Sequence, residues 1–335
     1  MVKITDVARR AGVSPSTVSY ALSGKRPISD ETRRRVQAAV RELGYRAHVR
    51  ARGGTGAGAR VLALSVPLRS GVHVPVVTQF AVSVVTAARA HGHDVLLLTR
   101  DEGEEDVGRV AEAGLADALV VMDVQLQDPR LPLLRSSPLP SVLIGVPAEP
   151  DGLTCVDLDF GAAGELCVEH LARLGHRTVA LVGSPPEVYV RRTAFARRLV
   201  RGFTAAADRH RLSSAVHPCG ADRGAARALA ERLLREQPAP TGVVVHNEPL
   251  LDPLTDAFEQ LGLRIPADLS LVAVCPAPVA ASARVPLTSV TVPAAELGTR
   301  AVHLLVQKLS GAPVPQVTLL PPRLTERAST GPRPV

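Results

Sequence analysis

Aromatic side chains are scarce in this sequence, which has five Phe, three Tyr and no Trp among 335 residues. Aromatic rings commonly line ligand pockets, and their flat apolar faces can stack on a sugar ring. With so few rings, the composition speaks against a carbohydrate site built on stacked aromatic residues. Hydrophobic residues nevertheless make up 46% of the chain, which is enough for sizeable buried cores.

Motifs for catalysis and metal binding are also missing. The four cysteines lack the CxxC spacing of metal sites, which is typical of buried, reduced thiols; they are Cys155, Cys167, Cys219 and Cys275. The glycine-rich residues 53–60 superficially resemble a phosphate loop, but they follow a helix rather than a strand, and we interpret them as a linker. The sequence contains no nucleophile elbow. We therefore predict no enzymatic activity, no metal and no cofactor.

Long apolar segments are absent as well. No uncharged apolar run approaches the ~20 residues that a membrane-spanning helix needs, and no apolar secretion signal precedes the basic N-terminal segment. An exported solute-binding protein would need such a signal. We therefore expect a cytoplasmic protein that does not contact a membrane.

The basic residues are concentrated at one end of the chain. Residues 1–60 hold 13 of the 39 Lys and Arg but only 4 of the 32 Asp and Glu, a net charge of +9, whereas the remaining residues carry −2. Lysine and arginine release counterions from nucleic-acid phosphates, so a compact basic segment indicates a polyanionic partner. A uniformly basic enzyme would not show this distribution.

The same segment predicts a helix, a glycine turn and a second helix. Apolar residues recur at helical spacing up to Gly12, which ends the first helix; they are Ile4, Val7, Ala8 and Ala11. Ser14 is a good N-cap and Pro15 suits a first helical position, so a second helix is expected to about Leu22. Ser29 caps a third helix that Gly44 ends.

The second helix has an outer face of small polar side chains. Its inward residues are predicted to be Val18, Ala21 and Leu22, and its outward ones Pro15, Ser16, Ser19 and Tyr20, with Thr17 at the edge. A helix fits the DNA major groove, where short hydroxyl side chains reach phosphates and base edges. An ordinary small helical bundle is the alternative, and the local charge argues against it.

After residue 60 the chain alternates short apolar runs with amphipathic segments, which predicts parallel sheets with helices on both faces. The expected strands are residues 61–68, 94–99, 118–122, 141–146, 178–183, 242–246 and 269–274. The expected helices are residues 76–90, 162–174, 197–209, 225–236, 254–261 and 296–310.

The stretch VKITDVARRAGVSPSTVSYALSGKRPISDETRRRVQAAVRELGYR resembles the headpiece of the LacI/GalR family of bacterial transcriptional regulators. Further segments resemble the family in its order: VDLDFGAAGELCVEHLARLGHRTVALVG, GLRIPADLSLVAV, PLTSVTVPAAELGTRAVHLLVQKLSG and LTERAST. The resemblance implies an α/β protein with a helix-turn-helix headpiece in residues 1–46 and a hinge and linker in residues 47–60. Residues 61–335 would form a two-lobed sensor like the periplasmic binding proteins, with the C-terminal helix returning to the first lobe.

The implied function is a repressor that binds an inverted-repeat operator in double-stranded DNA as a homodimer. A small-molecule effector, such as a sugar or another polar metabolite, would bind between the lobes and change operator affinity. Two alternatives remain. The sensor could be blind to effectors or answer a protein partner, or the α/β core could serve a solute-binding or enzymatic role.

The resemblance also implies DNA-binding residues. The positions that read bases in the family correspond to Pro15, Ser16 and Tyr20. Many family members have arginine at the position of Tyr20. The alternative for Tyr20 is that it packs against its own helix. The full predicted set is Thr5, Ser14, Pro15, Ser16, Thr17, Ser19, Tyr20, Lys25, His48, Arg50 and Arg52. Gly54 stands at the family's minor-groove leucine, so we expect a short hinge helix at most and less DNA bending.

Effector-binding residues follow from the same resemblance. The predicted set is Tyr189, Arg198, Asn247, Glu248 and Cys275. Asn247 matches the family pattern, whereas Arg198 lies one position from the family's arginine and Cys275 replaces an aspartate. Asn247 could instead cap the helix that starts near Pro249. Tyr189 and Phe195 are the candidate aromatic residues of the cleft.

Overall fold

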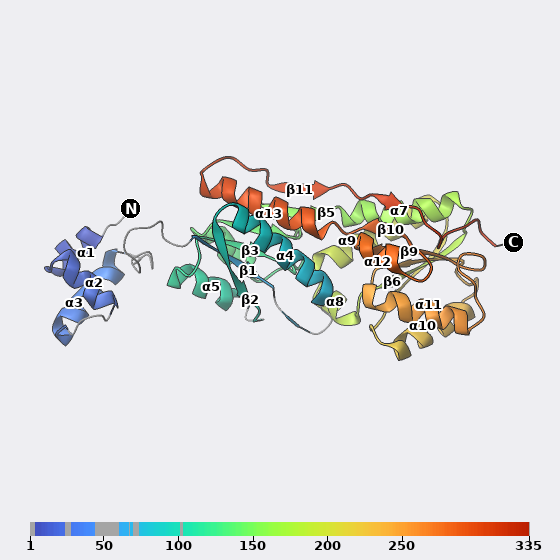
Figure 1. The fold of residues 1–335 in the computed structure, drawn as a ribbon, viewed down its shortest axis with the longest axis horizontal. Helices are drawn as coiled ribbons and strands as arrows, with labels where there is room; N and C mark the ends of the chain where they lie inside the picture. The colour runs from blue at the N-terminus through green and yellow to red at the C-terminus, as the bar shows by residue number, and fades with distance from the viewer. Residues whose placement is uncertain are drawn as a thin grey trace.

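The computed structural model describes residues 4–23, 28–43, 60–66, 68–69, 74–100 and 103–334. Its first part is a bundle of short helices, α1 (Ile4–Ala11), α2 (Pro15–Ser23) and α3 (Asp30–Leu43), seen at the left of Figure 1. The bundle shares a small apolar core, which includes Val7, Ala8, Ala11, Val18, Val36 and Ala39. The predicted caps are confirmed, because the hydroxyls of Ser14 and Ser29 accept hydrogen bonds from the amides of Thr17 and Thr32.

The first lobe is built on a parallel sheet with the strand order β11-β5-β4-β3-β1-β2. Its strands are β1 (Arg60–Ser65), β2 (His93–Leu98), β3 (Ala118–Val121), β4 (Ser141–Ile144), β5 (Cys155–Leu158) and β11 (Val317–Leu320). Helices α4 (Val74–Ala90) and α13 (Ala294–Leu309) pack on one face. Helices α5 (Glu104–Ala113) and α6 (Leu131–Ser136) cover the other.

The second lobe repeats this design with the strand order β12-β10-β9-β8-β6-β7. Its strands are β6 (Thr178–Gly183), β7 (Ser213–Pro218), β8 (Gly242–Val245), β9 (Ser270–Cys275), β10 (Thr288–Thr291) and β12 (Leu324–Thr325). Helices α7 (Phe160–Arg173) and α9 (Ala194–Arg209) lie on one face, and α10 (Arg223–Arg235) and α11 (Leu251–Gln260) on the other. The short helices α8 (Pro186–Val190), α12 (Ala277–Ser282) and η2 (Glu248–Leu250) complete the lobe.

The predicted parallel sheets with helices on both faces are confirmed. Central strands such as β8 are buried along their whole length, which explains why they appear in the sequence as continuous apolar runs. The two-residue strand β12 is an exception, since it pairs antiparallel with β10. Among the described residues, no helix is both long and apolar enough to cross a membrane.

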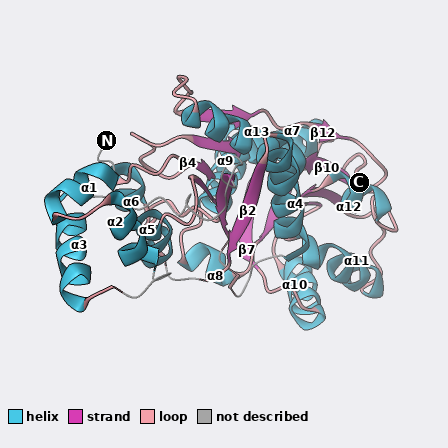
Figure 2. Cartoon of the chain, turned by 60° about the vertical axis from the view of Figure 1, so that its left-hand side comes forward, coloured by secondary structure: helices cyan, strands magenta, loops and turns pink. Residues whose placement is uncertain are grey.

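The described chain passes between the lobes at three places: from β5 to α7, from β10 to α13, and from β11 to β12. Helix α13 therefore returns to the first lobe, as predicted. Figure 1 shows α13, β11 and α7 along the upper edge of the two lobes, whereas α8 lies at the lower edge in Figures 1 and 2.

One predicted inward residue is exposed. Leu22 in the last turn of α2 keeps 37% of its surface exposed, whereas Val18 is fully buried and Ala21 packs against the core. The prediction for Leu22 was wrong: Val18 and Ala21 are the side chains of α2 that pack in the bundle core, and Leu22 is not part of that core.

Candidate functional site

The outer face of α2 carries the side chains that were predicted to read DNA. Thr5, Ser14, Pro15 and Ser16 are exposed, and Thr17, Ser19 and Tyr20 are half-buried. The Ser14 hydroxyl lies 2.8 Å from the hydroxyls of both Ser16 and Thr17, so these short side chains form one connected polar surface at the start of α2. The predicted residues Lys25, His48, Arg50 and Arg52, and the glycine hinge, lie outside the described residues.

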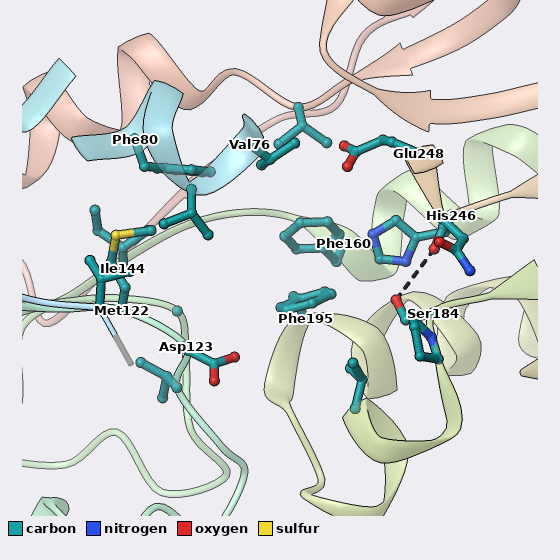
Figure 3. A pocket seen from close by; sticks show the side chains of 18 of the residues that line it. Val76, Phe80, Met122, Asp123, Ile144, Phe160, Ser184, Phe195, His246 and Glu248 are labelled. Atoms are coloured by element: carbon teal, nitrogen blue, oxygen red, sulfur yellow. Dashed lines mark hydrogen bonds between the residues drawn. The ribbon is translucent and has the colours of Figure 1, made fainter. Parts of the chain in front are cut away.

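A cavity of about 370 Å³ lies between the two lobes. Its first-lobe wall comes from α4 and from the loops after β1, β3 and β4. Its second-lobe wall comes from the starts of α7 and α9 and from the loops after β6 and β8 (Figure 3). The cavity thus lies at the carboxyl ends of parallel strands, where open α/β sheets bind ligands.

Three rings pack together on the second-lobe side of the cavity. The ring centres of Phe160 and Phe195 are 5.5 Å apart, and the imidazole of His246 lies 5.6 Å from Phe160 and 5.5 Å from Phe195. Figure 3 shows the two phenyl rings one above the other beside His246, with Phe80 across the cavity. Burial lowers the pKa of His246 to about 4, so its imidazole is neutral at physiological pH.

Asn247, which follows β8, is hydrogen-bonded to residues at the ends of strands β6 and β7. Its side-chain amide donates to the carbonyl of Gly183 at 3.3 Å and to that of Cys219 at 2.8 Å. It makes no side-chain cap on η2, so the helix-cap alternative for this residue is wrong. The amide instead fixes the loop that presents His246 and Glu248 to the cavity.

Arg198 lies behind the cavity wall rather than on it. Its guanidinium is 3.4 Å from Asp157 in β5 and 3.5 Å from Asp159, so it joins α9 to the end of β5 and to the segment that follows it. Asp157 lines the cavity, and burial raises its pKa to about 7 although Arg198 acts to lower it. The carboxyl therefore titrates near neutral pH.

Two further predicted residues do not line the cavity. Tyr189 is buried in α8, where burial raises its pKa to about 12 and where its backbone carbonyl accepts a hydrogen bond from Arg197. Cys275 is fully buried at the end of β9, with its pKa raised to about 12 by burial. Of the predicted effector residues, the cavity brings together Asn247 and Glu248.

Sequence reasoning missed most of the cavity wall. Phe80 lies within an expected amphipathic helix, and Asp123 and Arg191 follow regular elements in unpatterned loops. Asp123 adopts a left-handed φ of 52°, and its carboxyl is 3.6 Å from the Arg69 guanidinium. A usable signal was present for Asp123, because charged residues that directly follow buried parallel strands gather at the ligand edge of a sheet.

A strap joins the lobes beside the cavity. We define it as residues 124–127 of the first lobe and residues 192–194 of the second. Backbone hydrogen bonds run from Leu126 to Arg192 and from Ala194 to Val124, both at 2.9 Å. The Arg192 guanidinium also donates to the Gln127 side chain at 2.6 Å. The strap follows α8 and so lies away from the crossover segments of the upper edge.

The comparisons with known proteins agree with this architecture. The model of bacterial regulatory proteins of the lacI family matches residues 3–48, and the periplasmic binding protein-like domain matches residues 168–330. The HTH-type transcriptional regulator AglR of Rhizobium meliloti (strain 1021) is 30% identical over 345 residues, covering 99% of this chain and 95% of the relative. The chain belongs to the LacI family. It is a DNA-binding transcriptional regulator.

Solved structures of transcriptional regulators share the fold. A regulatory protein of the LacI family from Chloroflexus aggregans is 26% identical, with a TM-score of 0.71 over 81% of this chain and 98% of that one. The transcriptional regulator CelR, solved as a complex with cellobiose, is 24% identical, with a TM-score of 0.68 over 98% of this chain and 100% of that one. The shared fold therefore covers the headpiece and both lobes.

Proposed function

We propose that this regulator is a dimeric repressor whose affinity for an inverted-repeat operator is set by a small molecule in the interlobe cavity. The observation that carries the proposal is that both lobes contribute walls to one cavity. A ligand there contacts both lobes only when they are close together, so its binding favours one lobe arrangement over the other. This difference in affinity is what allosteric control of DNA binding requires.

The headpiece, residues 1–46, supplies DNA contact in this proposal. Ser16 and Tyr20 read base edges, while Thr17 and Ser19 contact phosphates. Residues 47–60 form the linker, in which Arg50 and Arg52 add phosphate or minor-groove contacts. Because Gly54 cannot wedge between base pairs, the operator is bent less than a leucine wedge would bend it.

A second copy of the chain binds along the free face of α4 and the edge strand β2. Val82 and Val85 in α4 are 58% and 46% exposed, and Leu97 in β2 is 50% exposed. These apolar side chains are aligned on one side of the first lobe, and such patches mark association surfaces. Pairing there would place two headpieces for two operator half-sites.

Fluorescence anisotropy with labelled duplexes tests the DNA part of this proposal. Operators would be selected from a randomised inverted-repeat library, and binding would be compared for the wild type, Ser16→Ala and Gln37→Ala. Ser16→Ala should relax base preference at one position of each half-site, because it removes a base contact worth about 1–3 kcal/mol of discrimination. Gln37 is exposed on α3, so its substitution is the matched control. Unchanged base preference in Ser16→Ala would overturn the proposed reading face.

A further inference from the structure

Apolar side chains make up most of the cavity lining. Three of the five phenylalanines of the chain, Phe80, Phe160 and Phe195, line it. The remaining apolar lining comes from both lobes: Val66, Val76, Val77, Met122, Val124, Ile144, Val188 and Val292. A chain with so few rings has thus placed most of its phenyl groups around one space, where they offer flat contact surfaces to a ligand (Figure 3).

Most polar side chains of the lining are already engaged by the protein. The Asp157 carboxyl is held by Arg198 and accepts from the Leu158 amide at 2.9 Å. The Ser184 hydroxyl donates to the carbonyl of His246 at 3.3 Å. The side-chain amide of Asn247 donates to two strand-end carbonyls.

The charged side chains at the two ends of the cavity are engaged as well. Asp123 is paired with Arg69 and lies in the field of Arg191. Arg191 and Glu248 both have interactions of their own within the protein. A ligand that used these groups would have to compete with existing partners.

His246 lies in no ion pair among the described residues, unlike Asp123, whose Oδ2 also lacks a hydrogen bond but lies 3.6 Å from the Arg69 guanidinium. His246 is 8% exposed, it lines the cavity, and its Nδ1 has no hydrogen-bond partner among the described residues. The imidazole is neutral, so it carries one N–H donor and one lone-pair acceptor. Because an unpaired N–H in apolar surroundings is costly, the proton is better placed on Nε2. Phe160 and Phe195 hold the ring in place.

This balance disfavours a free sugar. A sugar brings a hydroxyl on nearly every carbon, and each buried hydroxyl without a partner weakens binding by roughly fivefold to a hundredfold. An aromatic molecule with one polar group would instead fill the space between the phenyl rings and need a single hydrogen bond.

We propose that the effector of this cavity is a neutral, mostly apolar aromatic molecule with one hydrogen-bonding group, and that His246 is the residue that recognises this group. The proposal rests on the proposed function, because it names the ligand class of the same site. It makes His246 a specificity-determining residue, with Phe80, Phe160 and Phe195 as the surfaces against which the ligand ring packs.

A four-way comparison of ligand and protein tests the proposal. The probes are 2-naphthol and naphthalene, which differ by one hydroxyl, and the proteins are the wild type and His246→Phe. Binding is measured by fluorescence titration of the full chain, with cellobiose and maltose titrated by calorimetry. We expect the wild type to bind 2-naphthol more tightly than either sugar and roughly tenfold more tightly than naphthalene, which matches one hydrogen bond.

His246→Phe should remove this tenfold preference, because the ring nitrogens are lost. The preference is the ratio of the 2-naphthol and naphthalene affinities of the same variant, so an effect of the larger ring on both probes cancels. His246→Gln, which restores a hydrogen-bonding group, should recover part of the preference. The proposal is overturned if a sugar binds more tightly than both aromatic probes, if neither aromatic probe binds, or if the preference for 2-naphthol survives in His246→Phe.

The outcome for the proposed function is read separately, from operator anisotropy of the same preparations. A sugar that changes operator binding, while 2-naphthol does not, would leave the effector-controlled repressor standing and overturn the aromatic class. Failure of the ligand-free protein to prefer any inverted repeat would instead overturn the proposed function.

Discussion

At the residue scale, His246 should make stability depend on pH. In the unfolded chain a histidine binds a proton below about pH 6.5, whereas burial keeps His246 neutral in the folded protein down to about pH 4. Stability contributed by the neutral ring is therefore present above pH 6.5 and is lost as the pH falls through this window. Between pH 7 and pH 5 the loss should reach about 2 kcal/mol.

Urea unfolding of the wild type and His246→Phe at both pH values measures this effect. The variant cannot titrate at position 246, so its free energy of unfolding should fall by about 2 kcal/mol less than that of the wild type. Other buried histidines, such as His170 and His176, are present in both proteins and cancel in the comparison. Parallel pH dependence in the two proteins would show that His246 is already charged or exposed in the folded state.

The same residue shows what sequence reasoning can and cannot reach. The run of apolar residues before His246 correctly predicts a buried strand, and its family position correctly places Asn247 at a strand end facing the cavity. The role of His246 depends on Phe160 and Phe195, which lie far from it in sequence. No local pattern indicates that these rings meet, because ring packing is set by the tertiary fold.

At the element scale, helices α7 and α9 approach so closely that their backbones are in contact. A methyl group on Gly202 would collide with the backbone of Gly161, and one on Gly164 would lie 2.5 Å from the carbonyl oxygen of Leu199. Neither helix can move easily, because α7 and α9 share a fully buried core with the second sheet. These glycines are therefore required by the short distance between the two helices, and not by a turn in the backbone.

Gly202→Ala should lower the free energy of unfolding by about 3 kcal/mol, because the added carbon meets backbone atoms that have nowhere to go. Gly108→Ala in α5 is the matched control: its added carbon finds only Leu133 at 3.7 Å, so it should stabilise the protein by about 0.5–1 kcal/mol through helix propensity. Chemical denaturation measures the change in the free energy of unfolding of each variant relative to the wild type. A Gly202→Ala protein as stable as the wild type would contradict the close packing of the two helices.

Element boundaries were predictable where apolar periodicity was strong. The strand predicted at residues 178–183 matches β6, and the helix predicted at residues 225–236 matches α10 (Arg223–Arg235) within two residues. Strands β5, β7, β10, β11 and β12 were not predicted. Strands β7, β11 and β12 lie at sheet edges and are partly exposed, whereas β5 and β10 are largely buried runs of only four residues. Edge strands gain part of their order from pairing with a neighbour that the sequence does not reveal.

At the scale of the whole molecule, the apolar face on α4 and β2 should control assembly. The double variant Val82→Glu and Val85→Glu places two charges where the proposed second copy packs. Burying an unpaired charge is costly. We expect the double variant to be monomeric by analytical ultracentrifugation and to lose affinity for a two-half-site operator. Val190→Glu, at a site that is 81% exposed on α8, is the control, and a dimeric double variant would rule this face out.

The strap between residues 124–127 and residues 192–194 links the two lobes through hydrogen bonds. The first-lobe half of the strap is anchored in its own lobe: the Gln125 backbone amide donates to Asp128 at 3.1 Å, Asp128 pairs with Arg130 at 2.7 Å, and the Arg130 guanidinium donates to the carbonyl of Met122. The second-lobe half enters α9 directly, and Arg192 has a left-handed φ of 58°. Separating the lobes on this side therefore breaks the strap hydrogen bonds while the crossover segments on the other edge stay intact.

Gln127→Ala should shift the lobes toward a more open arrangement. It removes the acceptor of the 2.6 Å hydrogen bond from Arg192, which favours closure by about 1 kcal/mol, or roughly fivefold in the closed-to-open ratio. Distances between fluorophores on Glu112→Cys and Ala228→Cys, both exposed positions, report the change, since the native cysteines are buried. Gln260→Ala on exposed α11 should leave the distance unaltered. If Gln127→Ala also leaves it unaltered, the strap does not hold the lobes together, and the crossovers and cavity packing alone set their closure.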